Sequence, residues 1–145
     1  MDLQIQIIDD DDLICSSLER LFVKKGHRVI LSRNGEEALK VLGETTPDLT
    51  FLDLSLPDIN GIDLLKKIRR TAPNTPIVMI SGFGTIEIAV EALKLGAWDF
   101  LSKPLNLTKV NHTMDNLLTQ IRLEKELRQL RDEEQNQFLS QHVVG

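Results

Sequence analysis

Short apolar runs alternate along the chain with longer stretches in which apolar residues recur every three or four positions. The short runs are typical of buried strands, and the longer stretches are typical of amphipathic helices. Five strands are therefore expected, over residues 5–8, 28–32, 49–54, 77–81 and 98–102. A helix is expected after each strand, and the last helix begins beyond the Lys103-Pro104 pair.

Strands and helices that alternate in this way are typical of an α/β fold, in which helices cover both faces of a parallel sheet. We therefore expect a doubly wound sheet of five parallel strands with five helices. Parallel strands point the same way, so their carboxyl ends share one edge of the sheet. Ligands of such folds bind at that edge.

Polar side chains suited to metal and phosphate chemistry stand at the ends of four of these strands. The first strand runs into Asp9 and Asp10, the third ends near Asp53, the fourth ends in Ser81, and the fifth precedes Lys103. Each of them taken singly has an ordinary explanation, such as a helix cap or a solvated surface group. Crowded carboxylates suit a hard divalent cation such as Mg²⁺, which binds through oxygen. The joint pattern predicts a magnesium site.

Asp11 and Asp12 extend the acidic pair into a run of four carboxylates. We expect these two residues to start the first helix, where the helix dipole stabilises negative charge, with Asp12 as the N-cap. Without a metal ion, repulsion within the acidic cluster should raise the pKa of at least one carboxyl group.

Composition narrows the class of protein. The 145 residues carry a net charge of −5 and have a pI of about 5.2, which argues against nucleic-acid binding by this segment. No apolar run approaches the length of a membrane span, and no basic signal-peptide start is present. Cys15 has no cysteine partner and no zinc-site spacing, so a reducing, cytoplasmic location is expected.

Three segments together resemble the receiver domain of two-component response regulators: IIDDDDLI, DLTFLDLSLPDINGIDLLKKIR and PIVMISGFGTIEIAVEALKLGAWDFLSKP. The resemblance rests on an acidic pair, a D-x-x-x-P-x-x-x-G motif, a Ser-Gly pair and a Lys-Pro pair, each at the expected strand end. It implies a flavodoxin-like fold with strand order 2-1-3-4-5 and a receiver domain over residues 1–121.

By this resemblance, Asp53 is the phosphoacceptor that takes a phosphoryl group from a phosphohistidine of a sensor histidine kinase. Asp9 and Asp10 would bind Mg²⁺ together with Asp53 and the backbone carbonyl of Ser55. Lys103 would pair with the phosphoryl oxygens. The domain would be a regulatory phosphoacceptor that catalyses only its own phosphotransfer and dephosphorylation.

The resemblance also implies a switch. The Ser81 hydroxyl would turn to hydrogen-bond the phosphoryl group, and the ring of Phe100 would change rotamer; many family members have tyrosine at that position. The Lys103-Pro104 bond would be cis. Ser55 and Phe83 stand where an acid or amide would hold an attacking water, so slow self-dephosphorylation is expected.

The tail carries two apolar stripes. Residues 107–121 present one apolar face, and Leu123, Leu127 and Leu130 then lie on roughly the opposite side. We expect residues 122–145 to form a helical linker that pairs as a coiled coil, or else a solvated helix. A homodimer is expected through this linker, through the surface of helix 4, strand 5 and helix 5, or through both.

The end of the sequence resembles the run into the sigma-54-interacting AAA+ ATPase domain of nitrogen-regulation-type response regulators. This implies an output domain in the full-length protein and a role in transcription activation. The alternative is a stand-alone phosphorelay or chemotaxis-type receiver.

Two other classes fit the sequence less well. A haloacid-dehalogenase-like phosphatase would need a second acid two residues after its nucleophile, where Ser55 stands. A nucleotide-binding domain would need a P-loop or a G-x-G-x-x-G motif after the first strand, and neither is present.

Overall fold

The computed structural model describes residues 2–142, with side chains described through residue 139. Residues 143–145, at the end of the expected linker, lie outside the described part. The chain divides into two compact units, of which the first ends at Asn106 and the second begins at Leu107.

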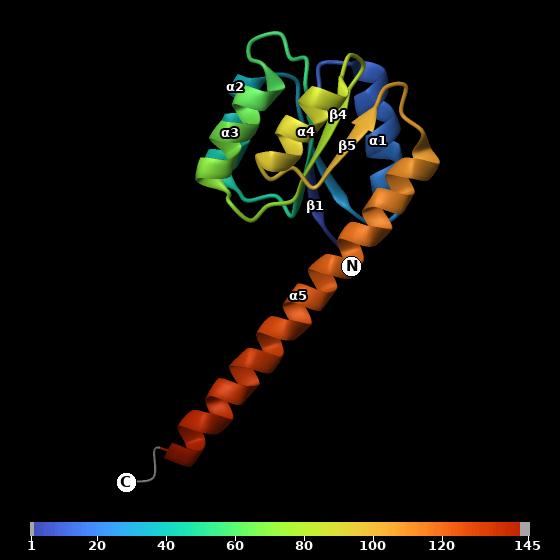
Figure 1. Cartoon of the computed structure of the whole chain (residues 1–145). Helices are drawn as coiled ribbons and strands as arrows, with labels where there is room; N and C mark the ends of the chain where they lie inside the picture. The colour runs from blue at the N-terminus through green and yellow to red at the C-terminus, as the bar shows by residue number, and fades with distance from the viewer. Residues whose placement is uncertain (1, 143–145) are drawn as a thin grey trace. The chain divides into compact units, whose positions relative to one another are not determined.

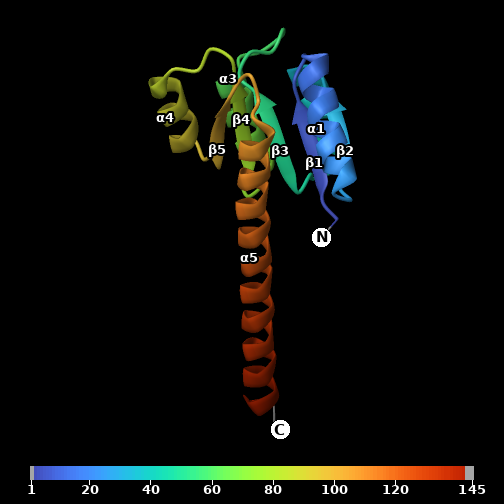
Figure 2. The same cartoon turned by 90° about the vertical axis from the view of Figure 1, so that its right-hand side faces the viewer.

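The first unit contains a five-stranded parallel sheet in the order β2-β1-β3-β4-β5. Figure 2 shows the strands side by side in this order. Their bounds are Gln4–Ile8 for β1, Arg28–Ser32 for β2, Leu49–Asp53 for β3, Ile77–Ser81 for β4 and Asp99–Ser102 for β5. The predicted fold class and strand order are confirmed.

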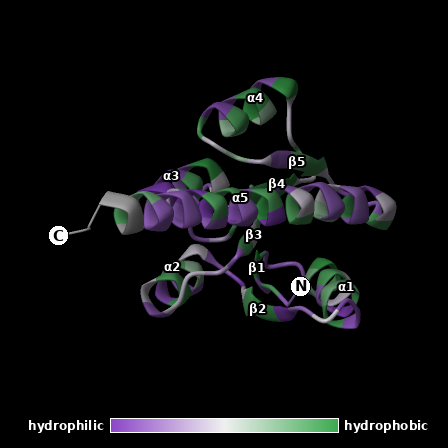
Figure 3. Ribbon diagram, turned by 90° about the horizontal axis from the view of Figure 1, so that it is seen from below, coloured by the Kyte–Doolittle hydropathy of each residue, from purple (hydrophilic) through white to green (hydrophobic). Residues whose placement is uncertain are grey.

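Four helices of the first unit connect these strands (Figure 1). They are α1 Asp12–Lys24, α2 Gly35–Glu44, α3 Gly61–Thr71 and α4 Ile86–Lys94. Seen end-on in Figure 3, α1 lies on one side of the strands, and α2 and α3 lie together on the other. Helices thus lie on both sides of the strands, and β3 and β4 are buried along their whole length.

The core of this unit is almost entirely aliphatic. Two aromatic rings, Phe22 of α1 and Phe51 of β3, pack at a centroid distance of 5.2 Å. One buried polar side chain, Gln6 of β1, is satisfied by its neighbours: its amide nitrogen lies 3.3 Å from Ser32 Oγ, and the Thr50 hydroxyl donates to its oxygen. Satisfied in this way, Gln6 carries little penalty for burial.

The start of α1 differs by one residue from the expectation. Asp11, not Asp12, is the N-cap, because its carboxylate accepts hydrogen bonds from the backbone N–H groups of Leu13 and Ile14. Asp12 is instead the first helical residue, and it pairs with Arg33. Both residues do start the helix, as predicted, and both are exposed.

The second unit is one helix, α5, which runs over 36 residues from Leu107 to His142. In the expected first apolar stripe, Val110, Met114 and Leu117 are buried, whereas Leu107 is 45% exposed. From residue 122 onward every described side chain is exposed. Among the described residues, no helix combines the length and the apolar character needed to cross a membrane.

Candidate functional site

Three carboxylates meet at the carboxyl edge of the sheet. Asp9, Asp10 and Asp53 each offer one oxygen, and these oxygens all lie within 4.8 Å of one another. The fold brings them together because β1 and β3 are neighbouring parallel strands that end side by side. Asp9 and Asp53 are buried, and Asp10 is exposed. The predicted acidic cluster is therefore present.

Lys103 neutralises part of this cluster. Its ammonium nitrogen lies 3.1 Å from Asp9 Oδ2 and 3.3 Å from Asp53 Oδ2. Burial alone would lower the pKa of Lys103, but the charges of Asp9 and Asp53 outweigh it and raise the pKa. The lysine is thus held in its charged form against both acids. The Lys103-Pro104 peptide bond is cis, as expected.

Asp9 is the most constrained of the three acids. Burial raises the pKa of Asp9 to about 6, with a further rise from the Asp53 charge, while the hydrogen bond from the Asp11 backbone N–H opposes the shift. Its Oδ1 accepts that N–H at 2.9 Å. Its Oδ2 accepts no hydrogen bond from any described residue, although the Lys103 ammonium lies close by.

These observations fit a divalent cation. The single ammonium of Lys103 offsets only part of the negative charge of three clustered carboxylates, so a further cation among them is favourable. Mg²⁺ takes oxygen ligands, needs only one or two carboxylates, and keeps several waters. Asp9, Asp10 and Asp53 supply such oxygens, and the exposure of Asp10 leaves room for water on that side.

The loop after Asp53 is held close to the strand end by Gly61, the last residue of the D-x-x-x-P-x-x-x-G motif. A Cβ at Gly61 would lie 2.5 Å from Leu54 Cα and 2.7 Å from the backbone oxygen of Asp53. No side chain fits in this space, since both contacts are backbone atoms. Asn60, the N-cap of α3, accepts a hydrogen bond from Ile62 N–H and fixes the same turn.

Asp58 is a positioning residue that the sequence did not reveal. Its carboxylate oxygens accept hydrogen bonds from the backbone N–H groups of Gly35 and Glu36, at 2.9 and 3.0 Å. These bonds lower the pKa of Asp58 and tie the loop after β3 to the first turn of α2. The partners lie more than 20 positions away in sequence, so no local pattern could have indicated the contact.

The expected switch residues meet around a second glycine. A Cβ at Gly84 would lie 2.5 Å from the Phe100 ring and 3.4 Å from Ser81 Cβ. The Ser81 hydroxyl oxygen accepts a hydrogen bond from Phe83 N–H at 3.0 Å, and the Ser81 carbonyl accepts one from Lys103 N–H. Ser81, Phe100 and Lys103 are therefore linked through one short loop.

Two further predicted site residues, Ser55 and Phe83, are exposed to solvent. Ser55 is exposed, and its N–H donates to Asp53 Oδ1 at 3.2 Å. The role of its carbonyl as a metal ligand stays a prediction. Phe83 is 85% exposed. Neither side chain is an acid or amide, so neither supplies the group that would hold a water against Asp53.

The model of the response regulator receiver domain matches residues 5–115. The chain belongs to this family. The receiver domain is 36% identical over 121 residues to the transcriptional regulatory protein ZraR of Klebsiella oxytoca, covering 83% of this chain and 27% of that protein. It is also 36% identical over 129 residues to the nitrogen assimilation regulatory protein NtrX of Azorhizobium caulinodans, covering 88% of this chain and 28% of that protein.

Solved structures agree with the receiver assignment. The crystal structure of NtrX from Brucella abortus in complex with ADP matches with a TM-score of 0.81 and 32% identity, over 90% of this chain and 30% of that one. A two-component response regulator from Clostridium difficile matches with a TM-score of 0.79 and 34% identity, over 82% of this chain and 98% of that one. The receiver domain thus spans under a third of the length of the curated relatives named above.

Proposed function

We propose that this receiver domain accepts a phosphoryl group on Asp53 from a sensor histidine kinase and transmits the change to an output domain. The observation that carries the proposal is the meeting of Asp9, Asp10 and Asp53 within 4.8 Å, with the Lys103 ammonium against two of them. This donor set suits a metal-assisted transfer of a phosphoryl group to a carboxylate.

In the proposed reaction, a carboxylate oxygen of Asp53 forms a bond to phosphorus while the bond from phosphorus to the kinase histidine nitrogen breaks. The histidine leaves with the electron pair of that bond. A bound Mg²⁺ would supply positive charge to the transferring oxygens. Lys103 adds a second positive charge, and Asp9 and Asp10, together with Asp53 and the Ser55 carbonyl, are the proposed metal ligands.

Signal transmission is proposed to run through Ser81 and Phe100. The Ser81 hydroxyl oxygen accepts a hydrogen bond from Phe83 N–H, and its own O–H would be donated to a phosphoryl group on Asp53, which would turn the side chain toward that group. Because the Phe100 ring lies against Gly84, three residues after Ser81, a shift of this loop changes the space available to the ring. The loop leads directly into α4, so the proposed readout is a change in α4.

The names and lengths of two relatives support the proposed output domain. ZraR is named as a transcriptional regulatory protein, and NtrX as a nitrogen assimilation regulatory protein. Both are more than three times as long as their matched parts. We therefore assign the receiver domain to residues 1–121 and a linker to residues 122–145, leading to a sigma-54-dependent AAA+ domain in a cytoplasmic transcription activator.

Dimerisation is part of the proposal. The exposed leucines of the linker, Leu123, Leu127 and Leu130, form one candidate surface. The α4 helix presents another, since Ile86 is 85% exposed and Leu93 is 48% exposed. Exposed apolar side chains at helical spacing favour association with a second copy.

The first test is labelling with acetyl phosphate, followed by intact-mass measurement. We expect one phosphoryl group on the wild type when Mg²⁺ is present and none after chelation with EDTA. Asp53→Asn should abolish labelling, because the amide is a poor nucleophile. Asp63→Asn, a matched change in the first turn of α3, should label like the wild type. Equal labelling of Asp53→Asn would disprove the assignment.

A second test concerns metal binding. Mg²⁺ should stabilise the folded chain by about 1 kcal/mol or more when its concentration is several times the dissociation constant. Thermal unfolding with and without Mg²⁺ would show this as a higher melting temperature. Asp10→Asn should remove the response while leaving the metal-free protein at least as stable, because it removes one like charge. A full magnesium response in this variant would exclude Asp10 as a ligand.

A third test concerns the lifetime of the phosphorylated form. Neither Ser55 nor Phe83 has a group that would hold an attacking water, so the phosphoaspartate should persist for minutes or longer. Ser55→Glu should shorten this lifetime. The measurement is the decay of the phosphorylated mass after the donor is removed. A half-life of seconds in the wild type, without any phosphatase, would contradict the expectation.

A further inference from the structure

The β3–α3 loop, residues 54–60, is closed at its base by backbone contacts. Gly61 N–H donates to the Leu54 carbonyl at 2.8 Å, and Ser55 and Asn60 form a single antiparallel bridge. Because this bond lies beside Ser55 and Asn60 and not between them, the two residues are a non-hydrogen-bonded pair, in which the carbonyl of each points away from the other. The Ser55 carbonyl is therefore not used by its partner in the bridge.

The tip of the same loop is bound to α2 through Asp58. Its carboxylate oxygens each accept one backbone N–H from the first turn of that helix, from Gly35 at 2.9 Å and from Glu36 at 3.0 Å. Donors of a first helical turn have no partner within the helix, so both bonds satisfy groups that need an acceptor from elsewhere. A carboxylate at this end is also favoured by the helix dipole, which makes the contact a strong one for an exposed side chain.

Ile59 makes a second contact between the loop tip and α2. A Cβ at Gly35 would lie 2.4 Å from Ile59 Cγ2 and 3.4 Å from both carboxylate oxygens of Asp58. The absence of a side chain at Gly35 therefore lets the loop approach the backbone of α2. Ile59 also packs against the aliphatic core, whereas Asp58 is exposed. The Asp58 contact can thus be removed without opening a cavity.

Resting on the proposed function, in which the Ser55 carbonyl is a magnesium ligand, we propose that Asp58 is a positioning residue for the metal site. Its two hydrogen bonds to α2 hold the loop in the shape that offers the Ser55 carbonyl to the cation. The same loop directs Ser55 N–H to Asp53 Oδ1, at 3.2 Å. Asp58 itself contacts neither the metal nor the phosphoryl group. It acts by preorganisation, because a loop that is already ordered binds a cation without a further loss of conformational entropy.

The N-cap of α2 provides a matched comparison. Asn34 accepts the N–H of Glu37 at 2.8 Å, so it serves a donor of the same helical turn as Asp58 does. Only Asp58, however, belongs to the β3–α3 loop. Loss of either side chain should weaken the start of α2, because a backbone donor loses its acceptor. Loss of Asp58 alone should change magnesium binding, and this difference separates a positioning role from a purely structural one.

Isothermal titration calorimetry on the 145-residue chain would measure the Mg²⁺ dissociation constant without any phosphorylation. Asp58→Ala should raise this constant about 10-fold, at the low end of the cost of losing a group that orients a metal ligand. Asp58→Asn keeps one acceptor oxygen, so its constant should lie between those of Asp58→Ala and the wild type. Asn34→Ala should bind Mg²⁺ like the wild type, although its metal-free form should melt at a lower temperature.

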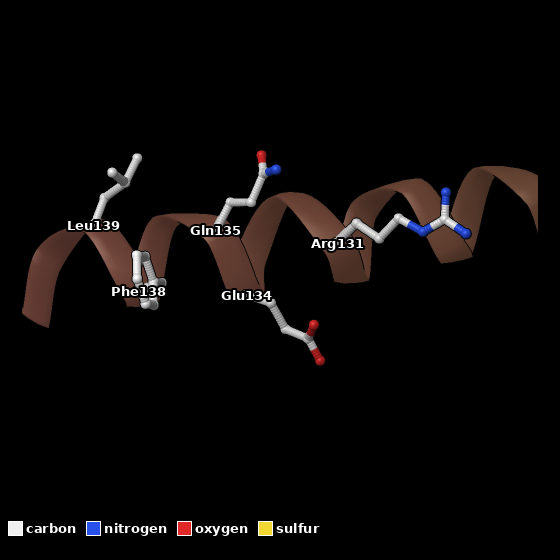
Figure 4. Close-up of a pocket in the computed structure, with 5 residues that line it drawn as sticks. All are labelled: Arg131, Glu134, Gln135, Phe138 and Leu139. Carbon is white, nitrogen blue, oxygen red and sulfur yellow. The ribbon is translucent and has the colours of Figure 1, made fainter.

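Two further variants control for the negative charge that Asp58→Ala removes. Glu36→Gln removes an exposed carboxylate from the first turn of α2. Glu134→Gln removes one from α5, where Figure 4 shows the Glu134 carboxylate directed away from the helix. Both changes leave the two hydrogen bonds of Asp58 intact, so both variants should bind Mg²⁺ like the wild type. An increase in the dissociation constant that is confined to the Asp58 variants would support positioning by hydrogen bonds.

Labelling by acetyl phosphate gives a second readout. At low Mg²⁺ concentration Asp58→Ala should label more slowly than the wild type, and at saturating Mg²⁺ its rate should recover, because the cation then orders the loop itself. A rate that stays equally low at every Mg²⁺ concentration would overturn the proposed role. So would a wild-type dissociation constant in Asp58→Ala, or an equal increase in Asn34→Ala.

Failure of this inference can be told apart from failure of the proposed function. The proposed function fails if the wild type neither binds Mg²⁺ nor labels on Asp53, whatever the variants do. A wild type that binds Mg²⁺ and labels normally, with Asp58→Ala and Asp58→Asn indistinguishable from it, would overturn the role of Asp58 alone.

Discussion

Gly61→Ala should destabilise the receiver domain by at least about 2 kcal/mol and lower its melting temperature by about 5 °C or more. The added methyl group would lie 2.5 Å from Leu54 Cα and 2.7 Å from the Asp53 carbonyl oxygen, far inside van der Waals contact. These are backbone atoms of the strand end, so α3 and the strand must move apart. Asp53 itself would shift, and labelling by acetyl phosphate should slow as well.

Gly43→Ala supplies a matched control. Gly43 lies near the end of α2, and a Cβ there would meet nothing within 4 Å. Alanine is the better helix former, so this change should stabilise the chain by up to about 1 kcal/mol. Chemical unfolding of both variants would measure the two effects. Equal effects of the same sign would show that the close approach at Gly61 does not control stability.

The sheet and the acidic site could be predicted from the sequence because both depend on simple periodicity. Continuous apolar runs mark strands that are buried on both faces, and parallel strands bring their ends to one edge. The positions after those runs therefore identify Asp9, Asp53 and Lys103 as neighbours from the sequence alone. The ammonium of Lys103 lies within 3.3 Å of both acids, although it is 50 positions from Asp53 in sequence.

Contacts that depend on side-chain placement could not be predicted in this way. The choice of Asp11 over Asp12 as the N-cap is decided by which carboxylate reaches the free N–H groups of α1. The bonds from Asp58 to the start of α2 join two loops that share no sequence pattern. The contact of Phe100 with Gly84 likewise requires the spacing of β4 and β5. Periodicity fixes which face a residue lies on, and not which partner it meets.

The strength of pairing through Leu123, Leu127 and Leu130 can be bounded from the exposed fractions of their side chains. Each of the three leucines exposes about half of its surface, so burying all six in a dimer would contribute several kcal/mol at about 1.5–3 kcal/mol per fully buried side chain. Association itself costs a comparable amount, about 4–15 kcal/mol. The pairing should therefore be weak, with a dimer forming only at high protein concentrations. Such a dimer can respond to phosphorylation, because a small change in receiver contacts shifts its population.

Leu127→Asp should abolish this dimer, raising its dissociation constant at least about 100-fold. The change removes the central leucine from both copies and places two like charges between the paired helices. Leu139→Asp is the matched control: Leu139 is a similarly exposed leucine of α5, but it lies about 120° away from Leu127 around the helix and should not affect pairing. Sedimentation equilibrium on both variants, with and without beryllofluoride to mimic the phosphoryl group, would measure the effect. Dimers of equal strength in the two variants would show that association uses another surface, and the exposed apolar residues of α4 would then be the next to change.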